Sequence, residues 1–243
     1  MDLNLKGRVA VVTGGAAGIG EAIAKGLAAE GCAVWILDRN GTAAQEAAAA
    51  VGGNAAVLEV SDASAVARAF EKVGRLDILV NAAGLLSTGL VADLPDTEWQ
   101  RISDVNVAGT IYCVKAAMPV LRKQRYGRII NLASVSAMRG GGSIGNTLYG
   151  ASKAGVAALT MGLARELGPE GITVNAIAPA VADTAMTRTS LTEEARNKIL
   201  ARIPLGRLAS LSDIADLAVF LASDRASFIT GTVIPVDGGI LTT

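Results

Sequence analysis

The most informative absence in this chain of 243 residues is histidine, which does not occur at all. Without an imidazole there is no Ser–His–Asp triad, no Cys–His nucleophile pair and no histidine-ligated zinc site. The two cysteines, Cys32 and Cys113, are too few for a thiolate metal cage or for the disulfide framework of a small secreted protein. We expect both to be inert buried thiols and the chain to hold no metal, so that acid–base chemistry falls to Asp, Glu, Lys or Tyr.

Charge is also scarce, because 18% of the residues are charged against about 25% in an average soluble domain. The 22 Lys and Arg residues balance the 22 Asp and Glu residues, so no net field attracts nucleic acid or an anionic membrane. No signal-peptide core and no uninterrupted apolar run of about 18 residues is visible, and we expect a cytoplasmic protein without a membrane span. An apolar content of 51% argues against a disordered chain.

Short runs rich in β-branched residues alternate with alanine-rich helical segments along the whole chain. Seven runs are mainly apolar rather than alternating between apolar and polar residues, which is typical of parallel strands covered by helices on both faces. The expected strands are 8–13, 33–38, 55–60, 76–81, 128–133, 172–178 and 232–236. The expected helices are 18–31, 42–51, one that begins near 61–62, 98–124, 149–167, and two around 192–202 and 212–222.

This order of elements predicts an α/β protein with a single-domain Rossmann fold over residues 1–243. Its seven strands would form one doubly wound parallel sheet with helices on both faces. The irregular segment 184–206, which is polar, apolar and basic by turns, is interpreted as a flap over the site.

A glycine-rich segment, Thr13-Gly14-Gly15-Ala16-Ala17-Gly18-Ile19-Gly20, stands between the first expected strand and the first expected helix. Glycine in this place permits a tight turn, close approach of the backbone to a diphosphate and close packing of helix against strand. The helix N-terminus adds free N–H groups and the positive end of its dipole. The segment by itself is weak evidence, and its position between strand and helix is what predicts a dinucleotide site.

Asp38 closes the second expected strand, 18 residues after Gly20, the last residue of the glycine-rich segment. A carboxylate there accepts hydrogen bonds from both ribose hydroxyls of an adenosine and repels a 2′-phosphate, which favours NAD. Arg39 offers a guanidinium to that same phosphate, so NADP is the alternative. The plainer interpretation of Asp38-Arg39-Asn40-Gly41 is a polar turn.

Tyr149 and Lys153 are four residues apart in an expected helix and therefore lie on the same face. A lysine close to a tyrosine lowers the pKa of the phenol by favouring the phenolate, which makes the tyrosine an acid–base group near neutral pH. The pattern is common on helices, but in a chain without histidine it is the best candidate for proton transfer.

Taken together, these segments resemble the short-chain dehydrogenase/reductase family over essentially the whole chain. Each matching motif is common alone, and their shared order and spacing make the resemblance specific. In chain order they are Thr13 to Gly20, Asn81-Ala82-Ala83-Gly84, Asn106, Ser134, Tyr149 with Lys153, Asn175-Ala176-Ile177-Ala178-Pro179 and Asp237-Gly238-Gly239.

The resemblance implies an NAD(P)-dependent enzyme that interconverts a secondary alcohol or polyol and its ketone by hydride transfer. Tyr149 would exchange a proton with the substrate oxygen, Lys153 would lower the pKa of its phenol and hold the nicotinamide ribose, and Ser134 would hydrogen-bond the same substrate oxygen. Asn106 would hold a water that links Lys153 to solvent. The implied cofactor contacts are Gly14, Ala17, Gly18, Ile19, Gly20, Asp38, Arg39, Glu59, Val60, Asn81, Ala82, Gly84, Tyr149, Lys153, Pro179 and Thr184.

Three positions depart from the family pattern or compete with it. Glu59 stands before Val60 where the family usually has an aspartate, and Ala180 replaces the usual glycine after Pro179. Ser136 competes with Ser134 for the serine role, and the match through residues 131–133 favours Ser134.

The substrate would lie between the segments 85–95, 135–148 and 184–206. They offer Leu85, Leu86, Val135, Met138, Met186 and Leu191 as apolar contacts, and Arg139, Asn146 and Arg188 as polar ones. The first alternative activity is an NADPH-dependent 3-oxoacyl-[acyl-carrier-protein] reductase, for which Arg125 suits the site rim and Glu170 does not. A non-catalytic cofactor-binding regulator is the other. We also expect a homotetramer that pairs through helices 98–124 and 149–167 and through the tail 234–243.

Overall fold

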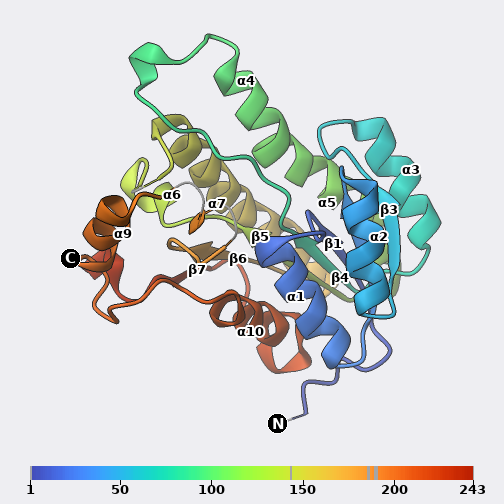
Figure 1. Cartoon of the computed structure of the whole chain (residues 1–243). Coiled ribbons are helices and arrows are strands. Elements are labelled where there is room, and N and C mark those ends of the chain that lie inside the picture. Colours follow the sequence, from blue (N-terminus) through green and yellow to red (C-terminus); the bar gives the residue numbers. More distant parts are fainter. Residues whose placement is uncertain (1, 143, 185–186, 189–190, 243) are drawn as a thin grey trace.

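The computed structural model describes residues 2–142, 144–184, 187–188 and 191–242, and its strands form one seven-stranded parallel sheet (Figure 1). The strand order is β3-β2-β1-β4-β5-β6-β7. The strands are β1 (Val9–Thr13), β2 (Ala33–Asp38), β3 (Asn54–Val57), β4 (Ile78–Asn81), β5 (Gly127–Leu132), β6 (Ile172–Pro179) and β7 (Val233–Val236). The predicted doubly wound Rossmann sheet is confirmed, and its winding reverses between β1 and β4, which opens a crevice at their carboxyl ends.

Helices cover both faces of this sheet. One face packs against α1 (Gly18–Ala29), α2 (Gly41–Ala50) and α10 (Leu211–Ala222). The other face packs against α3 (Ala63–Val73), α5 (Gly109–Gln124) and α7 (Thr147–Leu167). Neighbouring residues of one strand join opposite clusters, as Val11 and Val12 do in β1, which explains why apolar residues follow one another along the strands instead of alternating with polar ones. Across the described ranges, no helix is long and apolar enough to span a bilayer.

The predicted helix 98–124 is not uniform. It consists of α4 (Glu98–Ser103), a π-helical segment (Asp104–Ala108) and α5, and Figure 1 shows α4 reaching beyond the sheet at the top of the view. A π-helical turn accommodates an extra residue and is frequent at functional sites. Here it carries Asn106, whose side chain is buried.

Two shorter differences lie at the cavity edge. β3 ends at Val57, so that Glu59 and Val60 follow the strand rather than belong to it. Part of the expected loop after Ser134 forms the short helix α6 (Ser136–Arg139). In the segment interpreted as a flap, α9 (Glu193–Leu200) is capped by the Thr192 side chain.

Both cysteines are buried free thiols. Cys113 faces the core from α5, and burial raises the pKa of its thiol to about 12. Burial likewise raises the pKa of the Cys32 thiol to about 12. Neither is a thiolate at neutral pH, so neither is a nucleophile.

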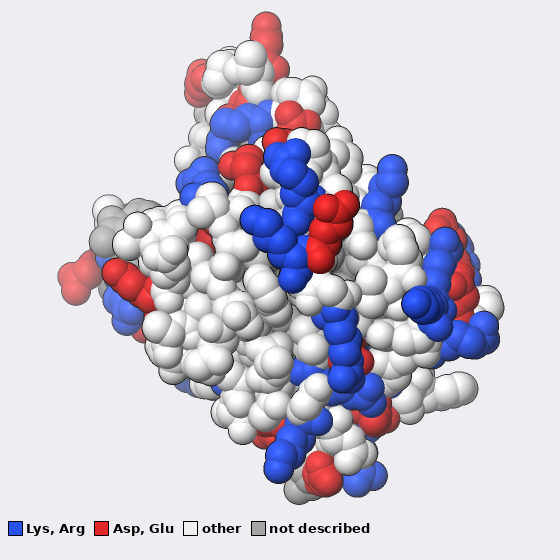
Figure 2. All heavy atoms as spheres, turned by 90° about the vertical axis from the view of Figure 1, so that its right-hand side faces the viewer, with Lys and Arg blue, Asp and Glu red and all other residues white. Residues whose placement is uncertain are grey.

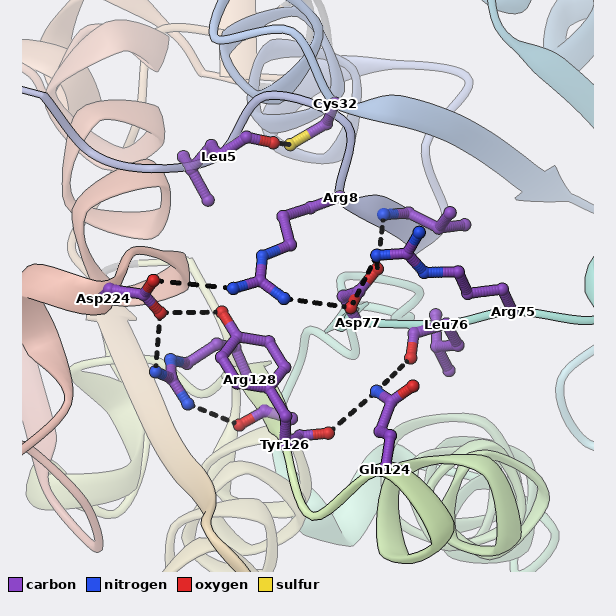
Figure 3. A network of polar contacts seen from close by, with 12 residues as sticks. Leu5, Arg8, Cys32, Arg75, Leu76, Asp77, Gln124, Tyr126, Arg128 and Asp224 are labelled. Carbon is purple, nitrogen blue, oxygen red and sulfur yellow. Dashed lines mark hydrogen bonds and ion pairs between the residues drawn. The ribbon is translucent and has the colours of Figure 1, made fainter.

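The amino ends of the strands are held by a network of charged side chains (Figure 3). The ring of Tyr126 lies between the guanidinium groups of Arg8 and Arg128, at 4.0 and 4.3 Å from its centroid. Asp224 accepts hydrogen bonds from Tyr126 Oη at 3.0 Å and from Arg128 Nη2 at 3.1 Å, and Arg8 also pairs with Asp77 at 3.3 Å. The Arg128 charge is buried and is therefore paired, because an unpaired buried charge would be costly. The network lies at the amino ends of the strands, opposite the crevice.

The balanced charge is visible on the surface. Figure 2 shows basic and acidic side chains close to one another on one face of the molecule, with broad uncharged areas between them. Local pairs include Lys25 with Glu21 at 2.6 Å and Arg122 with Glu170 at 2.9 Å.

Candidate active site

A cavity of about 480 Å³ opens at the carboxyl ends of the strands. Its wall contains every predicted cofactor residue except Asn81. Those that end or follow β1, β2 and β3 are Gly14, Ala17, Gly18, Ile19, Gly20, Asp38, Arg39, Glu59 and Val60. Those from the later part of the chain are Ala82, Gly84, Tyr149, Lys153, Pro179 and Thr184, and Ser134 joins them. The cavity therefore gathers both the expected nucleotide residues and three of the four expected catalytic residues.

The glycine-rich turn has the shape that a diphosphate needs. Gly14 has a φ of 63°, and a Cβ there would lie 2.6 Å from Ala83 Cα. A Cβ on Gly20 would run into the carbonyl oxygen of Gly14, whereas Gly18 faces open space. The N-cap residue of α1, Ala17, makes no side-chain hydrogen bond to the first turn. Bare backbone and the N–H groups of α1 thus border the cavity, so these residues fit a dinucleotide.

Asp38 presents its carboxylate at the edge of the same cavity. Its Oδ1 accepts from the backbone N–H of Asn40 at 3.0 Å and its Oδ2 from that of Ala16 at 3.3 Å. These bonds hold the carboxylate where an adenosine ribose is expected. Arg39, the next residue, is exposed and also lines the cavity.

Ser134, Tyr149 and Lys153 converge at the carboxyl end of β5. The Tyr149 phenol is hydrogen-bonded to Ser134. Lys153 Nζ donates to the Leu132 carbonyl at 2.6 Å and lies 5.9 Å from the centroid of the Tyr149 ring. Between the two candidate serines, Ser134 is the one in contact with Tyr149. Its hydroxyl accepts the backbone N–H of Ser136 at 3.1 Å.

Burial dominates the titration of this group. It raises the pKa of Tyr149, with the Ser134 hydrogen bond acting in the opposite direction. It also lowers the pKa of Lys153 from 10.5 to about 8. Lys153 is directed at the Leu132 carbonyl, and the expected lowering of the phenol pKa by this lysine stays a prediction. Tyr149 therefore carries its proton at neutral pH, which suits a proton donor.

Asn106 lies beside the cavity rather than in its wall. Its Oδ1 accepts from the backbone N–H of Leu85 at 2.8 Å, and its Nδ2 donates to the Leu85 carbonyl at 3.0 Å and to Ser152 Oγ at 2.9 Å. A Cβ on Gly84 would be 3.3 Å from Asn106 Oδ1 and 3.4 Å from Lys153 Nζ, so Asn106 and Lys153 flank Gly84. The amide is occupied by protein groups, and the expected water link to Lys153 stays a prediction.

The Asn81 side chain is turned into the sheet instead of the cavity, and its predicted cofactor contact stays a prediction. Its Nδ2 donates to Asn131 Oδ1 at 2.9 Å, and Asn131 Nδ2 donates to Thr160 Oγ1 at 2.9 Å. This chain of bonds ties β4 and β5 to α7. Side chains of a strand alternate between the two faces of the sheet. Asn81, the last residue of β4, is buried.

The predicted substrate contacts divide into two groups. Leu85, Leu86, Val135 and Arg139 do line the cavity, whereas Met138, Leu191, Asn146 and Arg188 do not, and Met186 lies outside the described residues. Three residues that the sequence does not single out, Ile144, Val181 and Ile240, complete an apolar wall. No local signal marks these three, because they come from separate loops that only the folded chain brings together.

A parallel sheet with a glycine-rich turn after its first strand, a carboxylate after its second and a Ser–Tyr–Lys group at the same edge defines a nicotinamide-dinucleotide oxidoreductase. The comparisons with known proteins agree with this class. A family model described as Enoyl-(Acyl carrier protein) reductase matches residues 14–241. The chain belongs to the short-chain dehydrogenase/reductase family.

Similar proteins cover the full length of the chain. The 3-oxoacyl-[acyl-carrier-protein] reductase FabG of Escherichia coli (strain K12) is 40% identical over 244 residues, 98% of this chain and 99% of that protein. The crystal structure of gox2181 matches with a TM-score of 0.96 and 33% identity, covering 100% of this chain and 98% of that one. A putative NAD(P) dependent gluconate 5-dehydrogenase from Beutenbergia cavernae, with bound NADP, matches with a TM-score of 0.93, 35% identity and full coverage of both chains.

Proposed function

We propose that this chain reduces the 3-oxo group of an acyl thioester, which was the first alternative raised by the sequence. The observation that carries the proposal is the full-length similarity, at 40% identity, to a 3-oxoacyl-[acyl-carrier-protein] reductase. The apolar wall beside Tyr149, formed by Leu85, Leu86, Ile144, Val181 and Ile240, supports it, because an acyl chain needs an apolar surface.

The side chains at the site supply proton transfer and orientation. When bound, a nicotinamide dinucleotide supplies the hydride that reduces the carbonyl carbon. Tyr149 donates its proton to the carbonyl oxygen, and the raised pKa of the phenol keeps that proton available at neutral pH. Ser134 hydrogen-bonds the same oxygen and stabilises the charge that develops on it. A ketone plus one hydride and one proton balances as the secondary alcohol.

Asp38 and Arg39 make opposite demands on the adenosine ribose. The carboxylate repels a 2′-phosphate, which is the basis of the expected NAD preference, whereas the guanidinium attracts it. The NADP named with the Beutenbergia cavernae structure favours the second tendency. We propose that both cofactors enter and that Asp38 sets their ratio. Asp38→Asn should raise the ratio of kcat/KM for NADPH over NADH, and Arg39→Gln should lower it. An unchanged ratio in both variants would refute this assignment.

Arg125, the residue expected at the rim for an acidic carrier protein, does not line the cavity of its own chain. Arg125 lies just before β5, at the amino ends of the strands and thus opposite the cavity. Its Nη2 donates to the Pro169 carbonyl at 2.9 Å. Next to it, Arg122 is paired with Glu170. We therefore propose the acyl thioester as the substrate without assigning a carrier-protein contact. The two thiols to compare are coenzyme A and acyl carrier protein.

The test is reduction of 3-oxobutanoyl groups, followed by loss of NADPH or NADH absorbance. The acyl group is offered on coenzyme A and on acyl carrier protein, with a panel of ketones as the comparison. We expect thioester reduction at a kcat/KM at least tenfold above the panel, and loss of it in Tyr149→Phe. Failure to reduce either thioester would overturn the proposal.

The alcohol or polyol dehydrogenase remains the second candidate. The similarity to a putative gluconate 5-dehydrogenase favours it. Oxidation of a polyol panel with NAD or NADP, with no thioester reduction, would select this candidate.

A further inference from the structure

Both main-chain polar groups of Tyr149 are held by side chains. Its N–H donates to Asn146 Oδ1 at 2.9 Å, and its C=O accepts from Ser152 Oγ at 2.8 Å. The two side chains belong to separate hydrogen-bonded chains, and both of these lead to the segment 85–87. That segment is part of the substrate wall, because Leu85 and Leu86 line the cavity.

The first chain passes through the π-helical turn. Asn106 Nδ2 donates to Ser152 Oγ at 2.9 Å and to the Leu85 carbonyl at 3.0 Å, while Asn106 Oδ1 accepts from the Leu85 N–H at 2.8 Å. Asn106 and Ser152 are both fully buried, so water does not compete for these bonds.

The second chain passes through Asn146, the N-cap of α7. Its Nδ2 donates to Ser87 Oγ at 2.8 Å, and its backbone N–H donates to the Ser87 carbonyl at 2.9 Å. Ser87 is 2% exposed, and its hydroxyl donates onward to the Glu98 carboxylate of α4. The chain from α4 to the Tyr149 backbone is therefore continuous.

Glu98 is itself fixed on α4. Arg101 Nε and Nη2 each donate to the Glu98 carboxylate at 2.8 Å. Arg101 Nη2 also donates to the Leu86 carbonyl at 3.3 Å. The Arg101 guanidinium and the Ser87 hydroxyl hold the pKa of Glu98 at about 2, so the carboxylate is ionised at every working pH.

We propose that Glu98, Ser87 and Asn146 are positioning residues, which hold Tyr149 in register with the substrate wall 85–87. In this arrangement the proton donor and the wall beside the substrate are one rigid unit. The inference rests on the proposed function only in that Tyr149 is the proton donor. A displacement of about 1 Å at a reacting group costs up to about a hundredfold in rate, so such a unit affects turnover directly.

A capping side chain needs only an oxygen atom that accepts a hydrogen bond from the first turn of the helix. A variant that keeps this oxygen therefore distinguishes a positioning role from a capping role. Asn146→Asp keeps an oxygen for the Tyr149 N–H but loses the amide that donates to Ser87. Asp62→Asn is the matched control, because Asp62 caps α3 by accepting from Ser64 at 2.8 Å and Ala65 at 3.0 Å, in a helix away from the cavity.

The first readout is steady-state kinetics with acetoacetyl coenzyme A, or with the fastest substrate of the ketone and polyol panels. Ser87→Ala and Asn146→Asp should lower kcat about tenfold or more while the KM for the cofactor changes less than twofold. Glu98→Gln, which still accepts from Ser87, should retain more activity than Glu98→Ala. Asp62→Asn should leave kcat unchanged.

The second readout needs no substrate. The protein is labelled with 3-fluorotyrosine, and the fluorine resonance of Tyr149 is assigned as the one missing in Tyr149→Phe. Ser87→Ala and Asn146→Asp should shift, split or broaden this resonance, and Asp62→Asn should not. An unmoved resonance together with an unchanged kcat, in folded variants, would overturn the inference. If Tyr149→Phe loses turnover while Ser87→Ala and Asn146→Asp keep it, the inference fails and the proposed function stands. If the wild-type protein turns over no substrate, that result counts against the proposed function only.

Discussion

Replacing Lys153 by methionine should change how the stability of the protein depends on pH. Lys153 is 5% exposed, and the hydrogen bond from its Nζ to the Leu132 carbonyl, at 2.6 Å, is the one hydrogen bond described for its side chain. Burial lowers its pKa from 10.5 to about 8. At about 1.4 kcal/mol per unit, the charged form costs the folded state about 3 kcal/mol.

The direction follows from the order of the two pKa values. Between about pH 8 and 10.5 the unfolded chain binds a proton on Lys153 that the folded chain has released, so stability rises with pH across this window. Below about pH 8 both states are protonated and the whole cost is present. Lys153→Met has no such proton. The stability of the variant relative to wild type should therefore be about 3 kcal/mol more favourable at pH 7 than near pH 10.5.

Urea unfolding at a fixed chain concentration, followed by circular dichroism at pH 7, 8, 9 and 10, measures this difference. Loss of the hydrogen bond to Leu132 lowers the stability of the variant by about 1 kcal/mol at every pH and leaves the trend intact. Lys25→Met on α1 is the control, because its ammonium is largely exposed beside Glu21. Parallel curves for wild type and Lys153→Met would refute the reasoning, since they would mean that Lys153 does not titrate as a desolvated group.

Three further predictions concern the nucleotide turn, the proton donor and the assembly. Gly20→Ala should abolish dinucleotide binding in calorimetry, because the new Cβ would overlap a carbonyl oxygen of the turn, whereas Gly162→Ala, which meets no atom within 4 Å, should bind normally. The rate of ketone reduction should stay level from pH 7 to about pH 9, because burial raises the pKa of Tyr149 above the ordinary phenol value of about 10 and the donor keeps its proton. Tyr149→Phe should lower kcat by about a hundredfold or more at every pH, and a wild-type rate that falls across this range would contradict the first part. Met161, 48% exposed on α7, should be covered in the expected homotetramer, so that Met161→Arg reduces the assembly size in light scattering, and a wild-type monomer would contradict the expectation.

The strands were predictable because their signal is local. A run such as 9–12 is apolar at every position, and a two-sided burial environment is the ordinary reason for that pattern. The end of β3 was less predictable, since Leu58 and Val60 remain buried after the strand pairing has stopped at Val57. Hydrophobicity reports burial, whereas strand boundaries depend on partners elsewhere in the sheet.

The site was predictable to the extent that its residues belong to motifs. The turn after β1, Asp38, Ser134, Tyr149 and Lys153 all reach one cavity as expected. Motifs did not reveal where side chains point, and Asn81 is the clearest case, since its contact is Asn131 within the sheet.

What the sequence determined by itself is the class of the molecule: a parallel sheet, a dinucleotide turn and a tyrosine–lysine pair in a chain that has no histidine. Those features are local in the chain, so spacing alone expresses them. The tertiary structure decided that Lys153 bonds to Leu132 rather than to the phenol, and that Ser87, Glu98 and Asn146 meet. The physical reason is that both results depend on burial and on contacts between distant segments, which exist only once the chain has folded.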